Sequence, residues 1–340
     1  MPHLRGARPT TVGVGYAPAH HGELLQGMFD DGTGRPRRAL VTLPHADCGS
    51  RAVFHPSQSH WGVVGTPELT KVRRAAVLAL REFTTHPSPA KGGQIEITSD
   101  VPRGIGMGSS TSDVTATIRA VADYHGVSLS REEVGRLAVL AECASDSIMI
   151  DDRVVLFAHR DGVVLETLGH SLPRLIVVGC DTDPGGDGVD TLGHRPADYD
   201  DRELGAFQVL RAALRRAIAT SDVALLGRVA TASARINQRF LPKPRLEQLL
   251  ELAVEHGGHG IQVAHSGTVA GLIFDASRPD AEADARRCAA RVEQLGLVIT
   301  AMIGCSPATV PDMVPVPAVA PIPAVLPTPA PVAADLKVNA

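Results

Sequence analysis

The stretch 101–112 reads VPRGIGMGSSTS, in which glycines at alternate positions lead into a run of hydroxyl side chains. The segment before it, 93–100, alternates isoleucines with polar residues, as a half-buried strand does. After it, apolar residues recur at helical spacing until Gly126, a residue that commonly follows a helix C-terminus. The sequence therefore predicts a strand, a glycine loop and a helix in that order.

The three glycines of this loop match neither common nucleotide-binding motif. No lysine follows them, as a Walker A loop requires, and the sixth position counted from Gly104 is Ser109, where a dinucleotide fingerprint has glycine. Gly104, Gly106 and Gly108 can still adopt left-handed backbone conformations that turn successive amides toward one point. A helix starting near Ser110 adds about half a positive charge at its N-terminus. We expect an anion site suited to a polyphosphate.

Hydroxyl side chains at the rim of this loop extend the hypothesis. Ser109, Ser110 and Thr111 could donate hydrogen bonds to phosphate or ligate Mg²⁺. In the structural alternative, the glycines only allow tight packing of strand against helix, and Ser110 is an N-cap paired with Asp113. The loop alone does not decide between the two.

Composition narrows the class of protein. A chain of 340 residues has room for about two domains, and a net charge of −4 gives no global attraction to nucleic acid or to an anionic membrane. The five cysteines are widely spaced without a CxxC pair, which favours reduced thiols over a disulfide framework. The N-terminus lacks the apolar stretch of a secretory signal, so we expect a cytoplasmic protein that binds a small ligand.

The remaining pattern is typical of an α+β fold. Strands are expected at 12–17 and 39–43 with a hairpin connection at 30–36, and a capping box at Ser130 and Glu133 opens a helix. Further strands and helices follow without regular βαβ repetition. The expected elements are a hairpin at 154–166, a strand at 174–180, helices at 201–219, 222–238, 244–256 and 279–294, and strands at 260–264, up to 275 and at 297–303.

Three motifs carry a family resemblance. PRGIGMGSSTSD (102–113) resembles the phosphate-binding motif of the GHMP kinases, which include galactokinase, homoserine kinase and mevalonate kinase. APAHHGELLQGMFD (17–30) and GIQVAHSGTVAGLIFD (260–275) resemble the first and third motifs of that family. Together with LPKP (241–244), they are most similar to the bacterial L-threonine kinases of cobamide biosynthesis.

The resemblance implies the GHMP kinase fold, an α+β arrangement of two lobes. The N-terminal lobe, residues 1–170, would be similar to ribosomal protein S5 and bind ATP. The C-terminal lobe, residues 171–305, would be ferredoxin-like. Residues 306–340 are rich in proline and alanine, and we expect them to be disordered.

The resemblance also implies ATP and Mg²⁺ as cofactors. Ser110 and Glu142 would ligate the metal, and Asp146 would be the catalytic residue that contacts the attacking hydroxyl. Two acids near a helix C-terminus are unfavourable for the helix dipole, which independently favours a functional role over a solvated helix end. The residues implied in phosphate binding are Pro102, Gly104, Gly106, Met107, Gly108, Ser109, Ser110 and Thr111.

The acceptor implied by the resemblance is a small hydroxy amino acid. We expect the protein to have no nucleic acid or membrane partner, and a homodimer is possible. Glu23 would receive its ammonium, unless it is a surface carboxylate. The other residues implied at the substrate are His20, His21, His265, Ser266 and Gly267. His20 and His21 replace a Ser-Cys pair of the threonine kinases, and His265 could instead be structural. We expect L-threonine to give O-phospho-L-threonine, with serine, homoserine or another hydroxy amino acid as alternatives. A non-catalytic, nucleotide-dependent sensor is the alternative from a different class.

Overall fold

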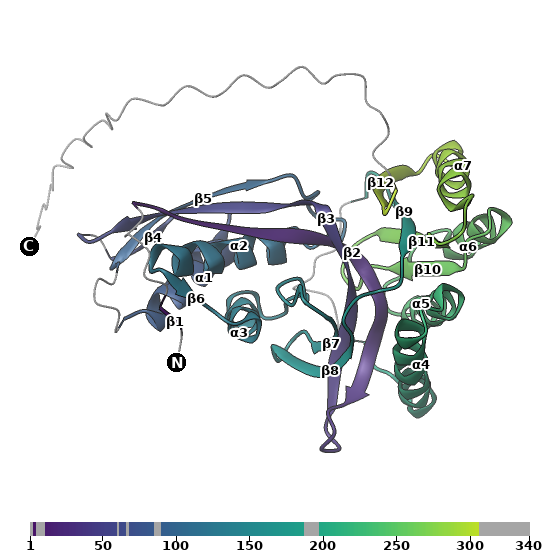
Figure 1. The fold of residues 1–340 in the computed structure, drawn as a ribbon, viewed down its shortest axis with the longest axis horizontal. Helices are drawn as coiled ribbons and strands as arrows, with labels where there is room; N and C mark the ends of the chain where they lie inside the picture. The colour runs from purple at the N-terminus through teal and green to yellow at the C-terminus, as the bar shows by residue number, and fades with distance from the viewer. Residues whose placement is uncertain are drawn as a thin grey trace, which may run out of the picture. The chain divides into compact units, whose positions relative to one another are not determined.

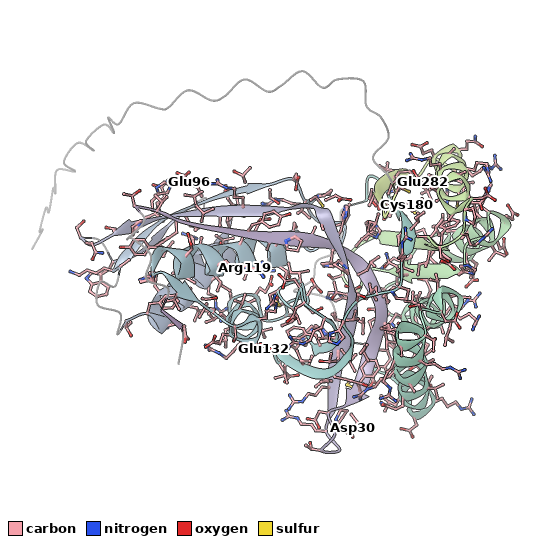
Figure 2. The ribbon with its side chains drawn as sticks, in the orientation of Figure 1. Asp30, Glu96, Arg119, Glu132, Cys180 and Glu282 are labelled. Atoms are coloured by element: carbon pink, nitrogen blue, oxygen red, sulfur yellow. The ribbon has the colours of Figure 1, made fainter. Side chains whose placement is uncertain are left out.

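Two long antiparallel strands, β2 (Gly13–Asp30) and β3 (Pro36–Ser57), run through the whole folded unit. In the computed structural model, the described residues are 3–4, 11–59, 61–65, 68–84, 90–186 and 197–305. The turn between the two strands is closed by Asp30 and Asp31, whose carboxylates accept hydrogen bonds from the amides of Gly32 and Thr33. Asp30 lies at this end of the hairpin in Figure 2. The predicted hairpin is confirmed, but the strands are much longer than the predicted segments.

Within the described residues, β2 and β3 are the centre of a ten-stranded sheet. Its main order is β12-β9-β11-β10-β2-β3-β5-β4, with β7 and β8 attached to β3 as a hairpin, and every pairing is antiparallel except that of β4 with β5. The other strands are β4 (Gly62–Val64), β5 (Gly92–Ser99), β7 (Val154–Ala158), β8 (Val163–Gly169), β9 (Leu175–Asp181), β10 (Gly260–Val263), β11 (Val269–Asp275) and β12 (Val298–Ile303). A short separate pair joins β1 (His3–Leu4) to β6 (Val127–Ser128).

Three helices, α1 (Thr70–Glu82), α2 (Ser109–Tyr124) and α3 (Arg131–Glu142), pack with β2, β3 and β5 around one apolar core (Figure 1). The predicted capping box opens α3, because Ser130 and Glu133 exchange hydrogen bonds with each other's amides. Helix α2 is buried along most of its length, including Val114, Ile118 and Val121. The glycine loop therefore leads into a rigid, buried helix.

Four later helices cover the other strands (Figure 1). α4 (Asp201–Ala219) and α5 (Val223–Asn237) share a core with the second half of β2, whereas α6 (Leu246–Glu255) and α7 (Ala281–Gln294) pack with β9, β10 and β11. The predicted α+β class is confirmed. Residues 1–305 form one compact unit, and the lobe boundary after residue 170 stays a prediction. The predicted disordered segment 306–340 lies outside the described residues.

Helix length and hydropathy bear on a membrane location. In the part of the chain that the structure describes, none of the helices combines the length and the apolar character needed to span a bilayer.

Candidate active site

The glycine loop has the backbone that the sequence predicts. Gly104, Gly106 and Gly108 have φ angles of 81°, 92° and 74°, all in the left-handed region. Gly108 is the N-cap of α2, which begins at Ser109, one residue before the predicted start. Within the described chain, the amides of residues 107–111 donate no hydrogen bond to another group. These amides are available to an anion at the positive end of the helix.

Two of the glycines are also required by close packing. A Cβ atom on Gly108 would lie 2.2 Å from Cδ2 of His20, and one on Gly106 would lie 2.6 Å from the Cβ of Ala264. A Cβ on Gly104 would meet no atom within 4 Å. The packing explanation therefore holds for Gly106 and Gly108, and both glycines bring the first and third sequence motifs against the loop.

The hydroxyl groups after the loop face Glu142, the last residue of α3. Ser110 Oγ donates to Glu142 Oε2 at 2.7 Å, and Thr111 Oγ1 donates to Glu142 Oε1 at 3.0 Å. Asp113 instead accepts hydrogen bonds from Ser50 and Arg103. The alternative in which Ser110 caps the helix is therefore wrong, because Gly108 occupies the N-cap and makes no side-chain cap.

Glu142 lies in an environment that suits a cation. Burial raises the pKa of Glu142 to about 7, although the hydrogen bond from Ser110 and the charge of Lys71 oppose this shift. Lys71 Nζ is 3.9 Å from Glu142 Oε2 and is partly exposed. The carboxylate is thus only partly compensated by the groups around it, and its oxygens lie beside the Ser110 hydroxyl.

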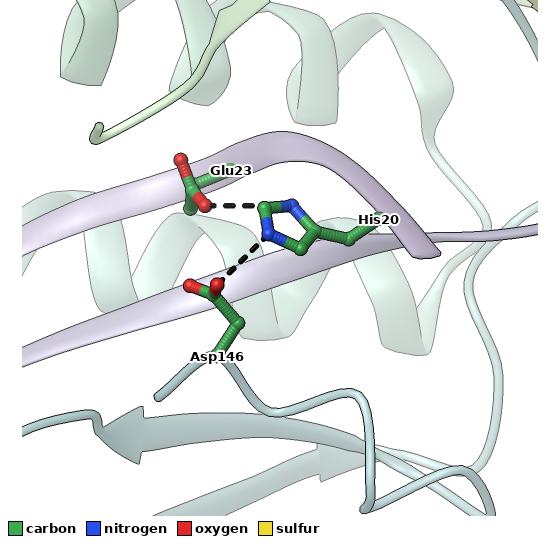
Figure 3. Close-up of side chains that lie close together, drawn as sticks. All are labelled: His20, Glu23 and Asp146. Atoms are coloured by element: carbon green, nitrogen blue, oxygen red, sulfur yellow. Dashed lines mark hydrogen bonds and ion pairs between the residues drawn. The ribbon is translucent and has the colours of Figure 1, made fainter. Parts of the chain in front are cut away.

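Asp146 is held by imidazoles from two distant parts of the chain. His20 Nε2 lies 2.9 Å from Asp146 Oδ2 (Figure 3), and His265 Nδ1 lies 3.5 Å from Asp146 Oδ1. Burial alone would raise the pKa of Asp146, but the facing His20 and His265 imidazoles outweigh it and lower that pKa. Asp146 is therefore ionised at neutral pH, and its buried Oδ1 accepts no hydrogen bond from the described residues.

Glu23 contacts both of the histidines that hold Asp146. Its Oε2 accepts the backbone N–H of His265 at 2.5 Å, and its Oε1 lies 3.1 Å from His265 Nδ1. Glu23 Oε1 also lies 3.8 Å from His20 Nδ1, as Figure 3 shows. Lys243 is also buried near Glu23. Burial lowers the pKa of the Lys243 ammonium to about 8, and the negative charge of Glu23 opposes this shift. The carboxylate of Glu23 is thereby engaged within the protein.

A cavity of about 600 Å³ joins the glycine loop to Asp146. The predicted site residues that line it are Gly104, Gly106, Met107, Gly108, Ser109, Ser110, Thr111, Glu142, Asp146, His265 and Ser266. The predicted site residues outside its lining are Pro102, His20, His21, Glu23 and Gly267. Predicted residues as far apart in the sequence as Gly104 and Ser266 thus line one cavity. A direct contact of Glu23 with substrate stays a prediction.

His21 points away from this cavity. Its side chain is fully buried, with Nε2 at 2.9 Å from Thr300 Oγ1 and Nδ1 at 2.8 Å from Gln262 Nε2. Burial lowers the pKa of His21 to about 3, so the ring is neutral. The structure therefore separates the two adjacent histidines, placing His20 on Asp146 and His21 between β10 and β12.

Sequence reasoning missed several cavity residues. Lys71, Arg38, His159 and Arg160 line the cavity, as do Tyr199 and Asn237. They come from five separate segments of the chain and belong to no motif. The sequence gives no local signal for them, because long-range contacts bring them to the site: β3 pairs with β7, α1 packs beside α3, and α5 packs against β2.

The imidazole of His265 makes stability depend on pH. Burial opposes its charge, but Glu23 and Asp146 raise the pKa of His265 to about 9, above its ordinary value of 6.5. The resulting stabilisation is complete below pH 6.5 and is lost as the pH rises toward 9. We expect the melting temperature to fall across this window, and to fall less in His265→Gln, as thermal unfolding at several pH values would show. If the melting temperature fell equally steeply with pH in both proteins, the raised pKa of His265 would not be the cause.

Comparison with known proteins agrees with the geometry. Residues 70–155 match the GHMP kinases N terminal domain, and residues 210–294 match the GHMP kinases C terminal domain. An L-threonine kinase of Citrobacter freundii is 31% identical over 80% of this chain and 89% of its own length. One from Salmonella typhimurium is 28% identical over 82% and 88%.

Solved structures share the fold. The homoserine kinase of Cytophaga hutchinsonii superposes with a TM-score of 0.61 at 15% identity, over 87% of this chain and 95% of that one. A mevalonate kinase from Staphylococcus aureus gives a TM-score of 0.55 at 18% identity, over 84% and 96%. The predicted resemblance is confirmed: the chain belongs to the GHMP kinase family and is a phosphotransferase.

Proposed function

We propose that this enzyme transfers the γ-phosphoryl group of ATP to the side-chain hydroxyl of a small amino acid, converting L-threonine into O-phospho-L-threonine. The observation that carries the proposal is the shared cavity. It joins the amides of residues 107–111, which donate no hydrogen bond within the described chain, to Asp146 Oδ1, which accepts none. The relatives named L-threonine kinase extend over most of the chain and favour threonine as acceptor.

Phosphate binding falls to the loop and the start of α2. The amides of Met107 to Thr111 would cradle the triphosphate, and Lys71 would add a positive charge from α1. Ser110 and Glu142 would hold Mg²⁺, because a hydroxyl and a partly compensated carboxylate are oxygen donors of the kind that magnesium prefers beside phosphates. Bound with ATP, Mg²⁺ supplies neutralisation of charge on the β- and γ-phosphates.

Asp146 would orient the acceptor. The substrate hydroxyl donates to Oδ1, and its oxygen attacks the γ-phosphorus as the bond from that phosphorus to the β–γ bridging oxygen breaks. ADP leaves, and the hydroxyl proton passes to Asp146. His20 and His265 hold the carboxylate in place, so that Oδ1 is oriented before the substrate arrives.

An acceptor panel tests the proposal. Purified protein is incubated with MgATP and L-threonine, L-serine, L-homoserine or mevalonate, with ADP release measured and the product identified by ³¹P NMR. We expect L-threonine to have the highest kcat/KM. Preference for homoserine or serine would move the assignment within the hydroxy amino acids. Preference for mevalonate, or no turnover with any of the four, would overturn it.

Ser110→Ala isolates the proposed metal ligand. We expect the affinity for MgATP to fall about tenfold, the order of one lost hydrogen-bonding or ligand contact. Affinity for ATP in EDTA should change much less, which provides the internal control. Isothermal titration of both proteins with both ligands measures this difference. If the variant bound MgATP with the same magnesium dependence as the wild type, Ser110 would not be a ligand of the metal.

A further inference from the structure

The cations that line the cavity fall into two groups. Among the described residues, Lys71, Arg38 and Arg160 are the lysine and arginine side chains of the lining. Lys71 lies beside Glu142, close to the hydroxyl groups of α2. Arg38 and Arg160 have no ion pair with a carboxylate in the described part of the chain. One region of the cavity therefore carries two arginines that are not held in a direct ion pair by the described residues.

Neighbouring arginines show the more usual arrangement. Arg37, the residue before Arg38, pairs with Asp31 at 2.8 Å and with Asp161 at 2.7 Å. Arg239 pairs with Glu203. The guanidinium groups of Arg38 and Arg160 repel each other: burial and the charge of Arg160 lower the pKa of Arg38, and the nearby Asp198 opposes this shift only in part. An anion between them would relieve this repulsion.

Strand register places this pair next to the acceptor region. β3 and β7 are antiparallel with Leu40 opposite Phe157, so Arg38 lies beside the end of β7, from which His159 and Arg160 continue. The ring of His159 is 5.4 Å from that of His265, measured between centroids, and His265 contacts Asp146. The cavity thus runs from the glycine loop past Asp146 to the two arginines.

Arg38 is fixed in place. Its guanidinium donates to the carbonyl of Ala197 and lies 5.8 Å from the centre of the Tyr199 ring. His159, between the arginines and His265, has its pKa lowered to about 3 by burial and by the nearby cations, so it adds no charge. An ordered guanidinium beside a neutral imidazole is suited to a planar anion such as a carboxylate.

We infer that Arg38 and Arg160 form a subsite for the carboxylate of the acceptor, so that the enzyme selects hydroxy acids and amino acids with a free carboxylate. The inference rests on the proposed function, because it assigns the far end of the same substrate. It also predicts that the two arginines act on acceptor binding and leave the ATP site unaffected.

Kinetics with L-threonine and L-threonine amide tests the subsite, since the amide keeps the hydroxyl and the ammonium but lacks the negative charge. We expect the wild type to prefer the acid by about a hundredfold in kcat/KM. In Arg38→Gln/Arg160→Gln, the KM for L-threonine should rise about as much, with kcat and the KM for ATP little changed. Arg37→Gln is the matched control, because this neighbouring arginine is paired with acids outside the cavity. Equal use of acid and amide by the wild type, or unchanged discrimination in the double variant, overturns the inference.

Thermal-shift titration separates this test from that of the proposed function. L-Threonine should stabilise the wild type more than its amide does, and the difference should disappear in the double variant. This result supports the subsite even where turnover of threonine is absent and the proposed function has failed. Turnover of threonine without any difference between acid and amide supports the kinase assignment and rejects the subsite. The lack of a threonine-induced shift in the wild type also rejects it.

Discussion

Asp146→Asn is expected to lower kcat by about a thousandfold, within the range that a positioned acid or base contributes to catalysis. Asparagine keeps the size of the side chain but cannot take the hydroxyl proton. Its amide also replaces a carboxylate that His20 and His265 hold at 2.9 and 3.5 Å. Affinity for a non-hydrolysable ATP analogue should stay close to wild type, because the amides of residues 107–111 are unchanged. Steady-state kinetics and calorimetric titration measure the two quantities.

A surface acid provides the control for this variant. Asp151 pairs with Arg119 at 3.3 Å and with Arg131 at 2.6 Å, outside the cavity lining. Asp151→Asn should therefore have nearly normal turnover. Circular dichroism of Asp146→Asn would verify that the protein is folded. A folded Asp146→Asn protein with a kcat within about tenfold of wild type would exclude this carboxylate from the proposed chemistry.

Local sequence signals predicted most of the elements correctly. The capping box of α3, the hairpin at 30–36 and the left-handed glycines depend on residues within a few positions of each other. Such signals are complete in the sequence, since the hydrogen bonds that they form are local. The same is true of the position of Glu142 at the end of a helix.

The length of β2 and β3 could not be predicted for a specific reason. The middle of β2 contains Pro18 and Gly22, and its pairing with β3 shifts register after Pro18, after His20 and after Glu23. Each shift breaks the alternation of apolar and polar residues by which a strand is predicted. At these irregularities the side chain of His20 contacts Asp146, and that of Glu23 contacts His265.

Long-range partners in the candidate site were also beyond sequence reasoning. His265 and Glu23 are 242 positions apart, and His20 and Asp146 are 126 apart. Each of these side chains by itself has several ordinary explanations. They come together only because β10 pairs with β2 opposite Glu23, which places the turn after β10 beside the first motif.

Gly108→Ala is expected to lower the free energy of unfolding by about 3 kcal/mol or more, by combining left-handed backbone strain with overpacking. The added Cβ would lie 2.2 Å from Cδ2 and 2.5 Å from Nε2 of His20, so the imidazole must move from Asp146. Gly104→Ala is the matched control, because its φ of 81° is also left-handed but its Cβ meets no atom within 4 Å. That variant should lose only about 1 kcal/mol, the cost of the backbone conformation. Urea unfolding of both proteins measures the difference.

The double variant Gly108→Ala/His20→Ala tests whether the imidazole is the cause. Removing the ring takes away the group that the new Cβ would contact, so the alanine should destabilise the His20→Ala protein much less than it destabilises the wild type. The kcat of the double variant should be close to that of either single variant, because each substitution alone already separates His20 from Asp146. Additive effects in stability and in kcat would instead mean that Gly108 acts independently of His20, through the phosphate-binding amides alone.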